Sequence, residues 1–256
     1  MLIRVLGKSP SWQDAGGACS AYLVRQGGHT LLLDCGSGSF AKLRAACDYA
    51  HVDDVVISHM HFDHFADLVP FANGLCYGPR RLARPRLHLP PAGAGLLREV
   101  ALAGGPRGLI DAAFQVSEYD PDQALELGPL RARFCRVPHF IASHAVRLTP
   151  AAHDGAAEPP SLTFSADTAP SEDLVRFAAG SELLLIEATL ERPEPEGPRG
   201  HLTAEEAGEH ARRAGARRVV LTHWSDELDA GRLRDRASAA FGAEVALAAD
   251  GAEYVV

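Results

Sequence analysis

Cysteine is scarce in this sequence of 256 residues: five are scattered along it, and no two form a CxxC pair. An odd number of isolated thiols argues against a disulfide framework and favours a reducing compartment, so we expect a cytoplasmic protein. Long apolar runs are also missing, since none approaches the roughly 20 residues of a membrane helix. The apolar start MLIRVL is too short for a signal peptide. We therefore expect no membrane association.

Basic residues are outnumbered, with 25 Lys and Arg against 33 Asp and Glu and a net charge of −8. This balance argues against broad non-specific binding of nucleic acid. The stretch GPRRLARPR (78–86), with Arg80 and Arg86, is a local exception. It either lines the mouth of a site and holds phosphate or forms a solvated loop, and the sequence favours neither.

Short strand patterns alternate with helix patterns along the chain, which is typical of an α/β protein. The helix over 203–215 is the clearest, because it opens with the capping box Thr203-x-x-Glu206 and stops at Gly215. No repeat or linker divides the chain, so we expect one domain over residues 1–256. The expected strands are 2–6, 21–25, 29–34, 55–58, 131–137, 144–149, 161–165, 181–188, 217–223, 244–248 and 252–256, and further helices are expected over 40–50, after residue 64 and over 228–242.

The segment SHMHFDHFADL (58–68) concentrates histidine and aspartate directly after an apolar strand pattern. Imidazole and carboxylate are the usual ligands of Zn²⁺ and related ions. Residues two apart in an extended segment point the same way, so His59 and His61 can bind one ion together. Asp63 and His64, where the chain turns into a helix, can face a second ion. The segment predicts two divalent ions; zinc is favoured, with manganese or iron as alternatives.

Two ions need further ligands, and three candidates follow strand patterns elsewhere. His139 follows RARFCRVP, Asp167 follows SLTFSA, and His223 ends RRVVLT. Asp167 carries two oxygens and can bridge both ions. Taken singly, each residue is typical of a surface or a helix cap, so the prediction depends on their joint pattern.

Together these motifs resemble the metallo-β-lactamase fold, and within it the branch of ribonuclease Z, the tRNA 3′-processing endonuclease, and related phosphodiesterases. The resemblance covers nearly the whole chain and implies a four-layer αββα sandwich. SHMHFDH is the signature of the fold, and GHLTAEEAG followed by VVLTHWS is specific for the branch. The other matching segments are VLGKSPS (5–11), LLLDCGSG (31–38) and FSADT (164–168).

The resemblance implies a ligand set of seven residues and a hydroxide that bridges the two ions as the nucleophile. Asp34 is implied to hold a ligand histidine by a hydrogen bond. His139 competes with His144 and His153, and is preferred because HFIASHAVR matches the family's histidine followed by a strand with an arginine, here Arg147. One metal is implied to bind His59, His61 and His139, the other Asp63, His64 and His223, with Asp167 between them. We expect His29, His51, His88 and His210 to be turn or surface residues.

Two ions of this kind suit phosphodiester hydrolysis, which also needs a proton donor for the leaving oxygen. His201 lies just before the helix that begins after Thr203, and the branch orients this histidine with a glutamate from a His-Glu-Ala-Thr motif. Here the segment is Ile186-Glu187-Ala188-Thr189, which keeps the glutamate but not the histidine. We expect Asp63, His201 and Glu187 to be the catalytic residues. The alternatives are a loop histidine and a solvated strand-end carboxylate.

The interval between His139's strand and FSADT is too short for the arm with which ribonuclease Z grips tRNA. The expected substrate is therefore a small phosphodiester or nucleotide, such as a cyclic nucleotide, or an RNA 3′ end. The alternatives are another hydrolase of the same fold (a lactonase, thioesterase or β-lactamase) and a non-catalytic metal-binding protein. His61 argues against a di-iron oxygen-reducing site, because those relatives carry glutamate there. A homodimer is the default expectation.

Overall fold

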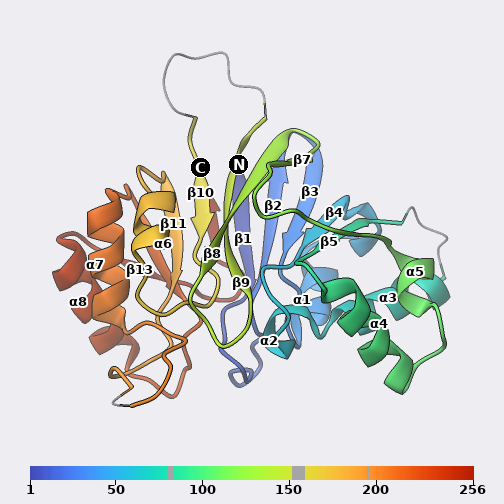
Figure 1. Cartoon of the computed structure of the whole chain (residues 1–256), viewed down its shortest axis with the longest axis horizontal. Helices are drawn as coiled ribbons and strands as arrows, with labels where there is room; N and C mark the ends of the chain where they lie inside the picture. Colours follow the sequence, from blue (N-terminus) through green and yellow to red (C-terminus); the bar gives the residue numbers. More distant parts are fainter. Residues whose placement is uncertain (80–83, 152–158, 195) are drawn as a thin grey trace.

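The computed structural model describes residues 1–79, 84–151, 159–194 and 196–256. Two seven-stranded sheets pack face to face, and helices cover the outer face of each sheet (Figure 1). This arrangement is the expected four-layer αββα sandwich. Within those residues, no helix combines the length and the apolar character needed to cross a membrane.

The first sheet has the strand order β14-β1-β2-β3-β4-β5-β6. Its pairs are antiparallel from β14 to β3 and parallel from β3 to β6. Its strands are β1 (Leu2–Gly7), β2 (Ala21–Gln26), β3 (His29–Leu33), β4 (Asp54–Val56), β5 (Arg86–Leu89), β6 (Gln115–Glu118) and β14 (Glu253–Val255). On this side of the molecule lie α1 (Ser39–Ala46), the 3₁₀ turn Tyr49–His51, α2 (Phe62–Phe65), α3 (Leu68–Tyr77), α4 (Gly93–Gly104) and α5 (Leu109–Ala113).

The second sheet has the order β13-β12-β11-β10-β9-β8-β7. Its strands are β7 (Leu125–Leu127), β8 (Leu130–Val137), β9 (Ser143–Pro150), β10 (Leu162–Phe164), β11 (Leu183–Glu187), β12 (Val219–Thr222) and β13 (Ala246–Leu247). Its outer face is covered by α6 (Glu172–Phe177), α7 (Ala204–Ala214) and α8 (Ala230–Phe241) (Figure 1). The capping box of α7 is present, and Gly215 ends the helix with a φ of 62°.

Successive residues of the central strands alternate between two cores, because side chains on a strand point to opposite faces in turn. Leu31 and Leu33 pack between the sheets, whereas Leu32 packs under the helices of the first sheet. Leu185 likewise faces the inter-sheet core, and Ile186 faces α7 and its neighbours. Each fully buried leucine or isoleucine contributes about 1.5–3 kcal/mol of transfer free energy. The apolar runs of these strands therefore stabilise both layers they contact.

The parallel strands bring their carboxyl ends to one edge of each sheet. β3 is parallel to β4, and β10, β11 and β12 are parallel to one another. Asp34 and His59 follow β3 and β4, Asp167 and His223 follow β10 and β12, and Glu187 ends β11. The fold thus places residues that are far apart in the sequence close together, at the carboxyl ends of the parallel strands.

Most expected elements are present, but some expectations were wrong. The strand expected over 244–248 is reduced to β13. The elements β5, β6, β7, α4, α5 and α6 were not anticipated, because their apolar runs are short or interrupted by proline and glycine. His51 is exposed as expected, whereas His88 and His210 are buried. His88 Nε2 lies 2.7 Å from Asp54 Oδ1, and His210 Nε2 accepts a hydrogen bond from the Ser171 amide.

The basic stretch 78–86 lies partly outside the described residues, which omit 80–83. Arg84 donates to the carbonyl oxygens of Asp111 and Phe114. Arg86 begins β5 and pairs with Asp54 at 2.6 Å, at the strand ends opposite to His59. These two arginines therefore support the fold at a distance from the expected site.

Candidate metal centre

One group of potential ligand atoms gathers His59, His61, His139 and Asp167 within 4.8 Å of one another. His59 follows β4 and His61 is the residue before α2, while His139 follows β8. Asp167 Oδ2 lies 3.8 Å from His59 Nε2 and 3.9 Å from His139 Nε2. This is the first of the two ligand sets expected from the sequence.

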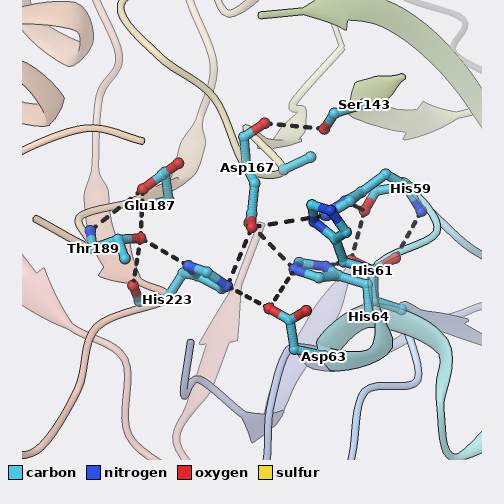
Figure 2. Close-up of polar contacts among 12 residues, drawn as sticks. His59, His61, Asp63, His64, Ser143, Asp167, Glu187, Thr189 and His223 are labelled. Atoms are coloured by element: carbon cyan, nitrogen blue, oxygen red, sulfur yellow. Dashed lines mark hydrogen bonds and ion pairs between the residues drawn. The ribbon is translucent and has the colours of Figure 1, made fainter. Parts of the chain in front are cut away.

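A second group consists of Asp63, His64, Asp167 and His223, and it is buried. His223 Nε2 lies 3.0 Å from Asp63 Oδ2 and 3.3 Å from Asp167 Oδ2. His64 Nε2 lies 3.2 Å from Asp167 Oδ1. Figure 2 shows Asp167 between His223 on one side and His59 and His64 on the other. Asp167 therefore belongs to both groups, as a bridging carboxylate must.

Hydrogen bonds fix the orientation of two of the candidate ligand histidines, His64 and His139. His64 Nδ1 lies 2.7 Å from the carboxylate of Asp34, and His139 Nδ1 lies 2.8 Å from the carbonyl oxygen of Gly200. Because a carboxylate and a carbonyl only accept hydrogen bonds, both Nδ1 atoms carry the proton. When the ring is neutral, the lone pair of each histidine is then on Nε2, which is the nitrogen that faces the cluster.

Two relayed hydrogen bonds have the same effect on His59 and His223. The Ser58 hydroxyl donates to Asp34 Oδ2 at 2.8 Å, so its oxygen accepts from His59 Nδ1 at 3.1 Å. The Thr189 hydroxyl, 2.6 Å from Glu187 Oε2, is likewise 2.8 Å from His223 Nδ1. A carboxylate at the end of each relay therefore sets the histidine tautomer.

Three buried polar atoms of the cluster have no hydrogen-bond partner: His59 Nε2, His64 Nε2 and Asp167 Oδ1. Buried polar groups in proteins are almost always satisfied, so orphaned atoms need an explanation. Nitrogen and carboxylate oxygen facing one space form the donor set of a divalent cation. The residues present therefore fit a metal centre.

The charges of the cluster also favour a cation. Burial alone would raise the pKa of Asp167, but His223 and His64 outweigh it and hold that pKa well below its usual value. Burial would lower the pKa of His64, and Asp167 with the other nearby carboxylates raises it well above the usual value instead. For His59, burial prevails and lowers the pKa, which keeps the ring neutral as a metal ligand must be.

Strained backbone is concentrated at this site. Among the described residues, four that are not glycine have a positive φ, and three of them are Asp34 (59°), Ala166 (51°) and His223 (53°). Asp34 bonds His64, Ala166 precedes Asp167, and His223 is itself an expected ligand. Left-handed backbone costs a residue with a Cβ roughly 1–2 kcal/mol, so the surrounding fold must hold these residues in place.

His201 and Glu187 lie together beside the second ligand group. His201 Nδ1 is 3.0 Å from Glu187 Oε1, and the His201 ring stacks on His223 with centroids 5.5 Å apart. Glu187 also accepts from the amide of Thr168 at 2.7 Å and from Thr189, so its oxygens are occupied by donors. Glu187 is fully buried, which excludes the solvated carboxylate considered as an alternative. Burial would lower the pKa of His201, but Glu187 raises it to about 9.

Among the alternatives for His139, His144 is buried in β9, contacts Tyr119 and is a member of neither ligand group, whereas His153 lies outside the described residues. Sequence reasoning missed Ser58, Thr189, the Gly200 carbonyl and Lys8. Thr189 ends the quoted Glu-Ala-Thr segment, so its motif held a usable signal. The contact of Lys8 with Trp224 gave no local signal, because the two residues are 216 positions apart.

Comparisons with known proteins agree with this geometry. A family model described as β-lactamase superfamily domain matches residues 29–224. The probable metallo-hydrolase YhfI of Bacillus subtilis is 29% identical, over 98% of both proteins. Its crystal structure, titled as a metallo-β-lactamase fold protein, matches with a TM-score of 0.84 at 25% identity over 99% of each chain.

A ribonuclease Z from Halorubrum lacusprofundi is 28% identical, covering 91% of this chain and 90% of that protein. The crystal structure of the short form of human tRNase Z shares the fold with a TM-score of 0.74 at 20% identity, over 100% of this chain and 99% of that one. The chain belongs to the β-lactamase superfamily and is a metal-dependent hydrolase with the metallo-β-lactamase fold, in its ribonuclease Z-like branch.

Proposed function

We propose that this protein is a phosphodiesterase with two divalent ions, zinc by preference, which hydrolyses a small nucleotide such as a cyclic nucleotide, or an RNA 3′ end. The observation that carries the proposal is the pair His201–Glu187 beside two ligand groups that share Asp167. A hydrolase of activated esters needs the metal centre alone. A poor alkoxide leaving group also needs a proton donor, and His201 supplies one.

In this proposal His59, His61 and His139 would hold one ion, and Asp63, His64 and His223 would hold the other, with Asp167 belonging to both groups. Two such ions, when bound, lower the pKa of a water molecule and neutralise charge on the phosphate oxygens.

The chain's own residues supply orientation and protons. Asp34, Ser58 and Thr189 bond the Nδ1 atoms of His64, His59 and His223, respectively, and so direct the Nε2 atoms of these three rings toward the cluster. Glu187 holds His201 through Nδ1, which leaves the His201 Nε2 proton for the departing oxygen. Burial would lower the pKa of His201, but Glu187 raises it to about 9, and this direction favours the protonated ring that a general acid requires.

The resemblance to ribonuclease Z supports a phosphodiester substrate, and the short interval between β9 and β10 supports a small one. That interval spans residues 151–161, of which 152–158 lie outside the described part of the chain. A lactonase, thioesterase or β-lactamase on the same fold is the rival, and the resemblance to ribonuclease Z favours the phosphodiesterase over these.

A substrate panel tests the proposal with metal-loaded protein. We expect turnover of bis(p-nitrophenyl) phosphate and of a cyclic nucleotide, weaker cleavage of a precursor tRNA, and no turnover of a lactone. Activity on the lactone alone would assign the protein to the rival class. Efficient cleavage of precursor tRNA at physiological salt without activity on small esters would show that the short interval was misinterpreted. No turnover of any substrate by protein with a full metal content would favour a non-catalytic role.

A further inference from the structure

Three exposed apolar side chains directly follow expected metal ligands in the sequence. Phe62 follows His61, and Phe140 and Ile141 follow His139; their exposed fractions are 61%, 52% and 38%. A single exposed hydrophobic residue needs no explanation. We call the three residues that flank these two expected ligands in the sequence, Phe62, Phe140 and Ile141, the apolar rim.

Phe140 is the member of this rim that also contacts the candidate acid. Its ring centroid lies 5.0 Å from that of His139 and 5.9 Å from that of His201. The ring is therefore beside both a ligand of the first ion and the group that protonates the leaving oxygen. A substrate whose phosphate is held at the metal centre must pass within reach of this ring.

The backbone of Gly200 holds the Phe140 ring in place. A Cβ at Gly200 would come within 2.3–2.7 Å of three ring carbons, so the ring packs directly on the glycine. The His139 Nδ1 proton is bonded to the carbonyl oxygen of the same glycine. The ring is thus fixed against the segment that carries His201, while about half of its surface remains open.

We propose that Phe140 is a specificity-determining residue that stacks on the base of a nucleotide whose phosphate is bound at the metal centre. The inference rests on the proposed function, because it takes the phosphate group from there. A preordered ring with one open side suits a planar aromatic group, and stacking of this kind tolerates all bases. The protein should therefore discriminate nucleotides from sugar phosphates while selecting weakly among bases.

The experiment measures binding rather than turnover, by calorimetry on metal-loaded protein. Adenosine 5′-monophosphate and ribose 5-phosphate share the sugar and the phosphate, so the ratio of their affinities reports the base alone. We expect the wild-type protein to bind the nucleotide roughly 5- to 100-fold more tightly. Phe140→Ala and Phe140→Leu should bring this ratio close to one, whereas Phe140→Tyr and Phe140→Trp should preserve it.

Tyr77→Ala is the matched control, because Tyr77 is an aromatic residue that is even more exposed than Phe140 and lies at the C-terminal end of α3. It should leave the ratio unchanged. A wild-type ratio near one, or a ratio that survives in Phe140→Leu with its full metal content, would overturn the inference and leave the phosphodiesterase proposal standing. A Phe140-dependent ratio in a protein that turns over no phosphodiester would support base stacking and overturn the catalytic proposal instead.

Discussion

The Lys8 ammonium group donates a hydrogen bond of 2.8 Å to the carbonyl oxygen of Trp224, the residue directly after the expected ligand His223. Lys8 Nζ also lies 3.4 Å from the centroid of the Trp224 ring and pairs with Asp14, so this lysine is almost completely buried. Asp14 in turn accepts from the amide of Asp226 at 3.0 Å. The segment after β1 thereby holds the backbone that directly follows His223, a residue with a strained, positive φ.

Lys8→Met should lower the affinity for the ion that His223 is expected to bind and leave the affinity for the other ion unchanged. The variant keeps the length of the side chain but loses the charge that holds the Trp224 carbonyl, so His223 can relax its backbone. Loss of such a supporting contact typically costs roughly tenfold or more in metal affinity. A zinc titration should show one unchanged and one weakened site. Lys42→Met is the control, since the chain's other lysine pairs with Asp250 at 2.9 Å and its loss should change neither site.

Metal stoichiometry separates the shared ligand from the unshared ones. The wild-type protein should hold two ions per chain after loading and desalting, Asp63→Ala about one, and Asp167→Ala fewer than one, because Asp167 belongs to both ligand groups. Elemental analysis measures this directly. Asp67→Asn is a matched control, because Asp67 is near in sequence but accepts from the Phe40 amide at 2.8 Å instead of facing the centre. A wild-type protein that takes up only one ion in excess zinc would contradict the expectation.

His201→Ala should separate proton transfer from metal binding. His201 is not in either of the two ligand groups that share Asp167, so both ions should remain bound. The rate on alkyl phosphodiesters should fall by roughly 10²–10⁴-fold, since the leaving alkoxide loses its acid. A p-nitrophenolate leaving group needs little protonation, so its rate should fall much less, whereas Asp63→Ala should slow both substrates alike. Equal losses on both substrates in His201→Ala would mean that the residue binds phosphate and is not an acid.

The pair Asp54–His88 makes the fold sensitive to acid at a place remote from the site. Burial alone would raise the pKa of Asp54, but hydrogen bonds from His88 and Arg86 lower it below its usual value. A carboxyl group with a lowered folded-state pKa contributes stability above its unfolded-state pKa and loses it as the pH falls through the folded-state pKa. The contribution is therefore present at pH 7 and disappears below about pH 4.

Asp54→Asn should thus lower the free energy of unfolding by roughly 2 kcal/mol at pH 7, because a charged acceptor of several hydrogen bonds is lost. Denaturant titrations at pH 7 and pH 3 should show the difference from the wild type shrinking at the lower pH. Asp173→Asn is the control, since Asp173 is exposed and pairs with Arg176 only at the surface of α6, where such pairs contribute little. A difference that is the same at both pH values would show that packing, and not charge, is what Asp54 supplies.

Much of the candidate site was predictable because its residues follow local rules. His59, His61, Asp63 and His64 lie within one short segment, where strand and helix geometry alone decides which side chains point together. Asp167 and His223 end apolar strands, and the ends of parallel strands meet at one edge of a sheet. The helix that Thr203 caps was likewise predictable from its capping box. These features depend on residues a few positions apart, so the sequence by itself determined them.

Other features depend on contacts between segments that are far apart in the chain. The sequence could not show that Thr189 bonds His223, that Gly200 supports both His139 and Phe140, or that Lys8 is buried over Trp224. It also predicted surface positions for His88 and His210, which are buried because Asp54 and Ser171 satisfy their ring nitrogens. A polar side chain can be buried where another group forms a hydrogen bond with it. Only the tertiary structure brings that group within hydrogen-bond distance. The candidate ligands could thus be predicted from local motifs, whereas the hydrogen bonds, backbone strain and support of these residues were decided by the packing of the two sheets.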